Sequence, residues 1–232
     1  MKITKEFFSN LLIHQILMLA IIVFSGCEKK EDKVTDIDGN VYRTINIGTQ
    51  TWMVENLKTT RYRNGDPIPN VTDLKQWENI TTGAYAWYEN DNSNKDPHGA
   101  LYNWFAVNDN RHIAPEGWHI PTTDDCIELI NYLGGKDLAG GKLKETGYIY
   151  WDSPNTGATN ETGFTALGSG YASGYMGGGH FSLIKIWFGF WSSTEYNNIA
   201  ADRLSLDYSN SRANLDQGFK INGMSVRCIK DN

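Results

Sequence analysis

The N-terminal segment limits how much of this chain can contribute to a folded domain. A short basic start precedes an apolar run from Leu11 to Phe24, which is shorter than the roughly 20 residues of a membrane-spanning helix. Two small residues, Ser25 and Gly26, follow this run. The order is typical of a secretory signal peptide, so we expect residues 1–26 to be removed and the fold to come from the remainder.

Cys27 comes directly after these small residues, and the junction resembles the lipobox of bacterial lipoproteins, in which the cysteine thiol is acylated. The resemblance implies lipidation at Cys27 and a membrane partner, with each buried methylene contributing about 0.8 kcal/mol. An ordinary signal peptide with an incidental cysteine is the alternative. Residues 27–35 are rich in Glu, Lys and Asp, which predicts a charged, solvated tether.

Part of this tether bears on localisation. The stretch Lys30-Glu31-Asp32 resembles the export signal that sends Bacteroidetes lipoproteins to the cell surface. A merely soluble spacer would have the same composition, so both interpretations stay open. We expect a lipid-anchored protein of the cell envelope, held at the outer membrane with its domain in the periplasm or on the cell surface.

Glycine and aromatic residues are frequent in the rest of the chain. The sequence has 23 Gly, 8 Trp, 12 Tyr and 9 Phe, a combination that predicts short strands joined by many turns. This aromatic content excludes a disordered chain. The net charge of −6, without a basic stripe, argues against a nucleic-acid partner. No Pro/Ser-rich linker interrupts residues 36–232, so we expect one α+β domain there.

One helix is clearly predicted, over about residues 122–133. Thr122 is a good N-cap, and Asp125 three residues later completes a weaker form of the capping box. Apolar residues then recur with helical spacing and form one stripe, which consists of Cys126, Leu129, Ile130 and Leu133.

Strands are predicted where polar and apolar residues alternate. Residues 41–47 and 50–54 form a hairpin candidate across the Gly48–Thr49 turn. Residues 168–180 contain six glycines and predict a long loop instead. Further short strands are expected at residues 84–88, 190–194, 203–206 and 225–230.

Seven short blocks follow one another in the order of a known family. They are Asp36–Tyr42, Ile47–Met53, Glu55–Leu57, Gly99–Trp104, Gly117–Thr122, Trp191–Glu195 and Ser225–Cys228. Together they resemble the Fibrobacter succinogenes major paralogous domain over about residues 36–231. The resemblance implies a domain of secreted and surface proteins whose biochemical function is largely unassigned.

The order of helix, Gly-rich loops and final strands is also similar to C-type-lectin-like folds, which formylglycine-generating enzymes share in broad outline. This looser resemblance implies short antiparallel strands, one clear helix and long Gly-rich loops. In such folds a disulfide often links the first helix to the last strand, so the resemblance implies a disulfide between Cys126 and Cys228. Two separate buried thiols are the alternative.

The sequence offers little for catalysis or metal binding. The histidines outside the signal segment are not spaced as metal ligands, and no Gly-x-Ser-x-Gly, P-loop or Cys-x-x-Cys motif is present. The Asx-rich residues 90–96 carry oxygen ligands suited to Ca²⁺, yet they lack the turn glycine of an EF-hand and also suit ordinary turns. We expect no catalytic residue, no bound metal and no cofactor.

Aromatic side chains in Gly-rich, polar sequence are the remaining candidates for a binding site. Tyr and Trp rings offer large, rigid contact areas for sugars or peptides. We therefore predict a ligand platform formed by Trp151, Tyr171, Tyr175 and His180. The alternative is that these residues fill the core, as we expect for the tryptophans within the family blocks.

These observations favour a non-catalytic domain that binds an extracellular glycan or protein ligand at the cell envelope. An enzyme of the formylglycine-generating type is one alternative, and it requires reactive cysteines near a cleft. A structural envelope component that only packs against its neighbours is the other.

Overall fold

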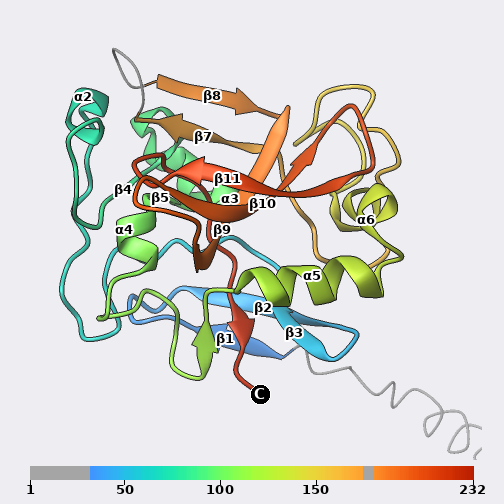
Figure 1. Cartoon of the computed structure of the whole chain (residues 1–232), viewed down its shortest axis with the longest axis horizontal. Helices are drawn as coiled ribbons and strands as arrows, with labels where there is room; N and C mark the ends of the chain where they lie inside the picture. The colour runs from blue at the N-terminus through green and yellow to red at the C-terminus, as the bar shows by residue number, and fades with distance from the viewer. Residues whose placement is uncertain (1–31, 175–179) are drawn as a thin grey trace, which may run out of the picture. The chain divides into compact units, whose positions relative to one another are not determined.

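The alternating residues near the start of the domain form the predicted hairpin (Figure 1). In the computed structural model, which describes residues 32–174 and 180–232, β2 (Val41–Ile47) pairs with β3 (Gln50–Met53). Gly48 in the turn has φ +62°, and a Cβ there would lie 2.8 Å from the Tyr132 ring, so glycine fits best. The hairpin belongs to a five-stranded sheet, ordered β1–β2–β3–β12–β6, whose other strands are β1 (Lys33–Thr35), β12 (Ile229–Lys230) and β6 (Trp118–His119).

A second sheet has three strands in the order β11–β10–β9, namely β9 (Trp187–Glu195), β10 (Ala200–Asp207) and β11 (Ala213–Phe219). Two smaller sheets each have two strands. They pair β4 (Tyr85–Ala86) with β5 (Leu101–Tyr102), and β7 (Ser169–Ser173) with β8 (His180–Ile184). All these named strands pair in the antiparallel sense, so the domain is of mixed α+β class, as predicted.

Helix α5 (Thr123–Tyr132) confirms the predicted helix. The backbone N–H of Thr122 donates to Asp125 Oδ2 at 2.8 Å, and the N–H of Asp125 donates to Thr122 Oγ1 at 3.2 Å, which completes the capping box. The predicted apolar stripe is buried. The remaining short helices are α2 (Leu74–Trp77), η2 (Tyr88–Asn90), η3 (Asn92–Asn94), α3 (Lys95–His98) and α4 (Trp104–Val107).

Helix α6 (Lys136–Leu143) was not predicted, because its two central glycines lower helix propensity. Tertiary packing requires both of them. A Cβ on Gly140 would overlap the carbonyl of Arg212, and a Cβ on Gly141 would overlap the carbonyl of Gly157. The glycines therefore let the helix pack directly against neighbouring backbone.

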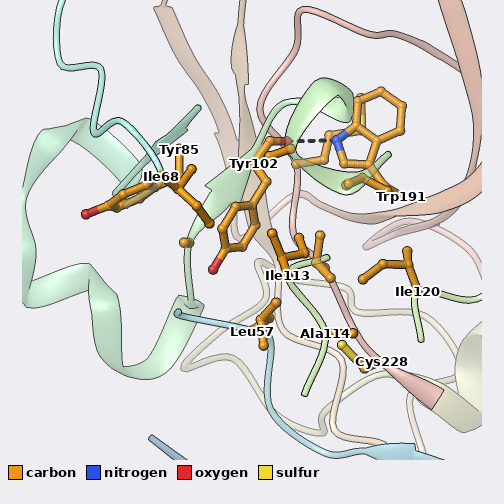
Figure 2. Close-up of a cluster of buried hydrophobic side chains, with 14 of the residues drawn as sticks. Leu57, Ile68, Tyr85, Tyr102, Ile113, Ala114, Ile120, Trp191 and Cys228 are labelled. Carbon is orange, nitrogen blue, oxygen red and sulfur yellow. Dashed lines mark hydrogen bonds between the residues drawn. The ribbon is translucent and has the colours of Figure 1, made fainter. Parts of the chain in front are cut away.

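Two hydrophobic cores share the strands β3 and β12. Trp52 and Ile229 belong to the core that also contains Cys126 of α5. Met53, the next residue on β3, and Cys228, which directly precedes β12, belong to the other core, part of which Figure 2 shows. Successive side chains of a strand point to opposite faces, so these strands separate the two cores.

This arrangement corrects the implied disulfide. Cys126 and Cys228 lie in different cores, and both thiols are free and buried. Burial raises the pKa of each thiol well above its ordinary value. The structure has the alternative arrangement, in which each cysteine packs as a small apolar side chain.

Candidate functional site

The four residues predicted to form an aromatic platform do not lie together. Trp151 is fully buried, and its Nε1–H donates to the carbonyl of Ala166 at 2.9 Å, so it is a core residue and the prediction is wrong for it. The polar sequence around Trp151 gave no sign of this partner. Tyr175 lies outside the described residues. Tyr171 is half-buried on β7, and His180 is exposed on β8.

The hairpin that carries Tyr171 and His180 replaces part of the predicted long loop. Its strands pair Tyr171 with Ser182 and Ser173 with His180. Gly170 has φ +61°, and a Cβ there would overlap the Ser182 carbonyl. Glycine in this segment therefore permits close approach of two strands, which the composition argument did not anticipate.

A groove of about 450 Å³ lies between this hairpin and the three-stranded sheet. Its volume is in the range of small-molecule sites, roughly 300–1,000 Å³. The hairpin contributes Tyr171, Ser173 and Leu183, and the following elements contribute the rest of the lining, including Trp187, Arg203, Gln217 and Asn222.

Two half-buried aromatic side chains form the apolar part of the groove. The rings of Tyr171 and Trp187 meet edge to face, with centroids 5.7 Å apart and planes inclined by 71°. Trp187 lies across Gly189, where an added Cβ would overlap the indole Cη2 atom. Gly189, two positions along β9, therefore leaves the space in which the Trp187 indole packs against its own strand.

Arg203 supplies the charge of the groove. Its Cζ lies 5.0 Å from the Trp187 ring centroid, within cation–π range. Its Nε–H donates to Asp216 Oδ1, and the Ser205 hydroxyl donates to Asp216 Oδ2 at 3.1 Å. The Arg203 side chain keeps 21% of its surface exposed. The guanidinium is thus oriented by neighbours, while part of the Arg203 side chain faces solvent.

Sequence reasoning missed Trp187 and Arg203. Arg203 was placed on a predicted strand, but no local pattern indicated which residues of other strands would surround it. The spacing Trp187-x-Gly189 is a usable signal, because a glycine on the same strand face leaves room for the indole.

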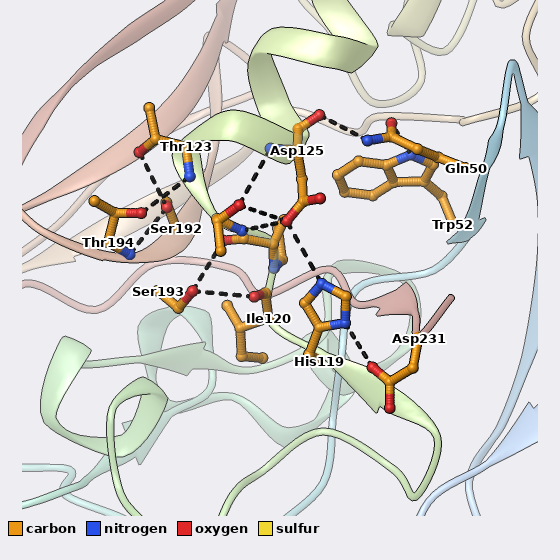
Figure 3. Close-up of polar contacts among 12 residues, drawn as sticks. Gln50, Trp52, His119, Ile120, Thr123, Asp125, Ser192, Ser193, Thr194 and Asp231 are labelled. Carbon is orange, nitrogen blue, oxygen red and sulfur yellow. Dashed lines mark hydrogen bonds and ion pairs between the residues drawn. The ribbon is translucent and has the colours of Figure 1, made fainter.

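His119 lies between two carboxylates and near Ser193 (Figure 3). His119 Nδ1 lies 2.6 Å from Asp231 Oδ1, and its Nε2 lies 3.5 Å from Asp125 Oδ2. The nearby Ser193 hydroxyl donates to the Ile120 carbonyl at 3.2 Å. Both ring nitrogens therefore face carboxylates, and this serine is not held as a nucleophile against the histidine.

The Asx-rich residues 90–96 run from the end of η2 through η3 into the start of α3. The Asp91 carboxylate accepts the Ser93 backbone N–H at 2.8 Å. Residues 32–174 and 180–232 contain no group of three or more His, Cys, Asp or Glu side chains placed to hold a metal ion. In the same part of the chain, no helix is both long enough and apolar enough to cross a bilayer.

The model of the Fibrobacter succinogenes major domain matches residues 45–230, which is more than half of the chain. No curated protein and no solved structure matches.

Proposed function

Since the chain belongs to the Fibrobacter succinogenes major domain family, a family of unknown function, we propose that it is a non-catalytic ligand-binding domain held at the cell envelope. Its binding site is the groove between the β7–β8 hairpin and the three-stranded sheet. The observation that carries this proposal is the pairing of Tyr171 with Trp187 beside Arg203 in that groove.

A saccharide is the ligand that suits these groups best. The apolar face of a sugar ring stacks on aromatic side chains, which are rigid and lose little conformational entropy. Polar side chains at the same groove, including Gln217 and Asn222, provide donors and acceptors for hydroxyl groups. The groove has room for a short stretch of a glycan rather than a whole protein surface.

The absence of catalysis is part of the proposal. A formylglycine-generating type of reaction needs a reactive thiolate at a cleft, whereas Cys126 and Cys228 are buried with raised pKa values. Among the described residues that line the groove, there is also no cysteine or histidine. The C-type-lectin-like arrangement stays part of the proposal, supported by the short antiparallel sheets.

We place the domain at the outer membrane through a lipid on Cys27, which lies outside the described residues. The lipobox-like junction and the charged tether support this location. Metabolic labelling with palmitate tests it, with Cys27→Ser as the unlabelled control. Protease treatment of intact cells distinguishes the cell surface from the periplasm, because only a surface domain is cleaved.

A glycan array tests the binding proposal directly. We expect the domain to capture glycans, and we expect Tyr171→Ala and Trp187→Ala to lose that capture while their melting temperatures show that they remain folded. Tyr148→Ala is the matched control, because Tyr148 is exposed and does not line the groove. Capture that survives both groove substitutions would refute the proposed site.

A further inference from the structure

We infer that the groove selects a saccharide that carries a carboxylate, such as a uronic acid, and that Arg203 binds this carboxylate through its terminal nitrogens. This inference rests on the proposed function and assigns the chemical class of its ligand.

The charge of the groove supports an anionic ligand. Among the described residues that line the groove, Arg203 is the charged one. Among these described residues, a carboxylate on the ligand therefore meets an opposite charge and no like charge.

The hydrogen-bond donors of Arg203 are only partly used. A guanidinium has five N–H donors. Within the described part of the chain, Nε pairs with Asp216, and Nη1 lies 3.8 Å from the sulfur of Met224, which is a weak acceptor. No oxygen atom of the described residues accepts from either terminal nitrogen of Arg203. The terminal nitrogens therefore keep N–H donors that no oxygen atom of the described residues uses.

The geometry of Arg203 also favours two parallel bonds to one carboxylate. Asp216, itself fixed by Ser205, engages the Nε edge of the guanidinium. Trp187 covers one face of the guanidinium. Nη1 contacts the sulfur of Met224, and no described residue accepts from Nη2. The planar fork of arginine matches a carboxylate in a bidentate manner.

Isothermal titration with matched saccharides tests this inference on the mature chain. The probes are trigalacturonic acid, its methyl ester and a neutral galactose trisaccharide. We expect the acid to bind roughly tenfold or more tightly than the ester, because hydrogen bonds to a charged group contribute more to binding than those to a neutral group. Arg203→Lys keeps the charge but loses the fork, so we expect it to weaken binding of the acid more than binding of the ester, which narrows the difference in affinity between the two.

Arg212→Lys is the matched control, because Arg212 is exposed and pairs with Asp137 outside the groove. If acid and ester bind equally and Arg203→Lys changes neither, while Trp187→Ala abolishes both, the carboxylate inference is wrong and the proposed function stands. If none of the three saccharides binds and the glycan array is also empty, both are wrong.

Discussion

Arg227 and Arg203 both stack on aromatic rings, yet they differ in burial and in how their donors are used. Arg227 is 1% exposed and lies with its Cζ 4.2 Å from the Phe164 ring centroid. Its Nε–H and Nη2–H donate to Asn56 Oδ1 at 3.2 and 2.9 Å, and Nη1–H donates to the Phe164 carbonyl. Arg203 instead pairs with a carboxylate and keeps its terminal nitrogens available.

The surroundings of Arg227 extend this contrast. Asn56 also donates through Nδ2 to the His98 carbonyl at 2.8 Å and to the Ser169 and Ser225 hydroxyls at 3.2 and 3.3 Å. Asn56 and Arg227 both come from blocks that carry the family resemblance, whereas the groove-lining Tyr171 and Trp187 lie between those blocks. The difference teaches that a buried arginine with occupied donors maintains the fold, while a partly exposed one keeps donors for the ligand that we propose.

The largest expected effect is on stability at Arg227. Arg227→Met leaves Asn56 Oδ1 and the Phe164 carbonyl without their donor, so we expect the free energy of unfolding to fall by about 2–4 kcal/mol. Urea denaturation measures this change. Arg203→Met is the control and should cost less than about 1 kcal/mol, because its ion pair is partly exposed. Equal losses in the two variants would remove the distinction between the arginines.

A second substitution tests how the Trp187 indole packs against Gly189 in the groove. Gly189→Ala places a Cβ on Trp187, and overpacking of this kind typically costs about 1–3 kcal/mol. We expect a lower melting temperature and loss of glycan capture. In the double variant Gly189→Ala/Trp187→Ala the clash is absent, so stability should recover relative to Gly189→Ala alone. A double variant no more stable than the single one would contradict the packing described.

Acidic pH should weaken the framework around Arg227. His98 is buried beside Ser169, and burial lowers its pKa below the ordinary 6.5. The unfolded chain therefore binds a proton more readily than the folded one, and stability falls as the pH drops below about 6.5. Each unit of lowered pKa corresponds to about 1.4 kcal/mol.

Melting temperatures between pH 7.5 and 5 measure this dependence. We expect His98→Gln to flatten the pH dependence. His180→Gln, at an exposed position on the hairpin, should leave the dependence as it is in the unmodified chain. The same slope in the His98 variant would show that other groups cause it.

The smallest effect is expected for alkylation of the two buried cysteines, which should not react in the folded protein. With both pKa values raised by burial, Cys126 and Cys228 should resist iodoacetamide at neutral pH. After denaturation without reductant, mass spectrometry should find both alkylated. Thiols that react only after reduction would instead reveal a disulfide.

Local patterns in the sequence predicted those parts of the fold that depend on near neighbours. The capping residues Thr122 and Asp125 and the alternation in residues 41–47 each specify an element within one short segment. Helix α6 and strand β7 could not be predicted in this way, because their glycines are explained by backbone approaching from distant segments.

The candidate site was predicted only in part for the same reason. Tyr171 was identified because aromatic residues in Gly-rich sequence are notable in any fold. Trp151 was assigned wrongly, since its buried partner, the Ala166 carbonyl, is visible only in three dimensions. Arg203 became a candidate only once the sheet brought it next to Trp187 and left its terminal nitrogens open.

The attachment of the β7–β8 hairpin has an evolutionary consequence. At the start of β7, the Ser169 hydroxyl accepts a hydrogen bond from Asn56 Nδ2, and farther along Ala172 forms a β-bridge with Gly223. Tyr171 lies between these two attachments and lines the groove. Mutations at Tyr171 can accumulate without disturbing the buried contacts of Asn56. If the groove binds the ligand that we propose, gene duplication followed by divergence at this position would yield copies with different ligand preferences on an unchanged scaffold.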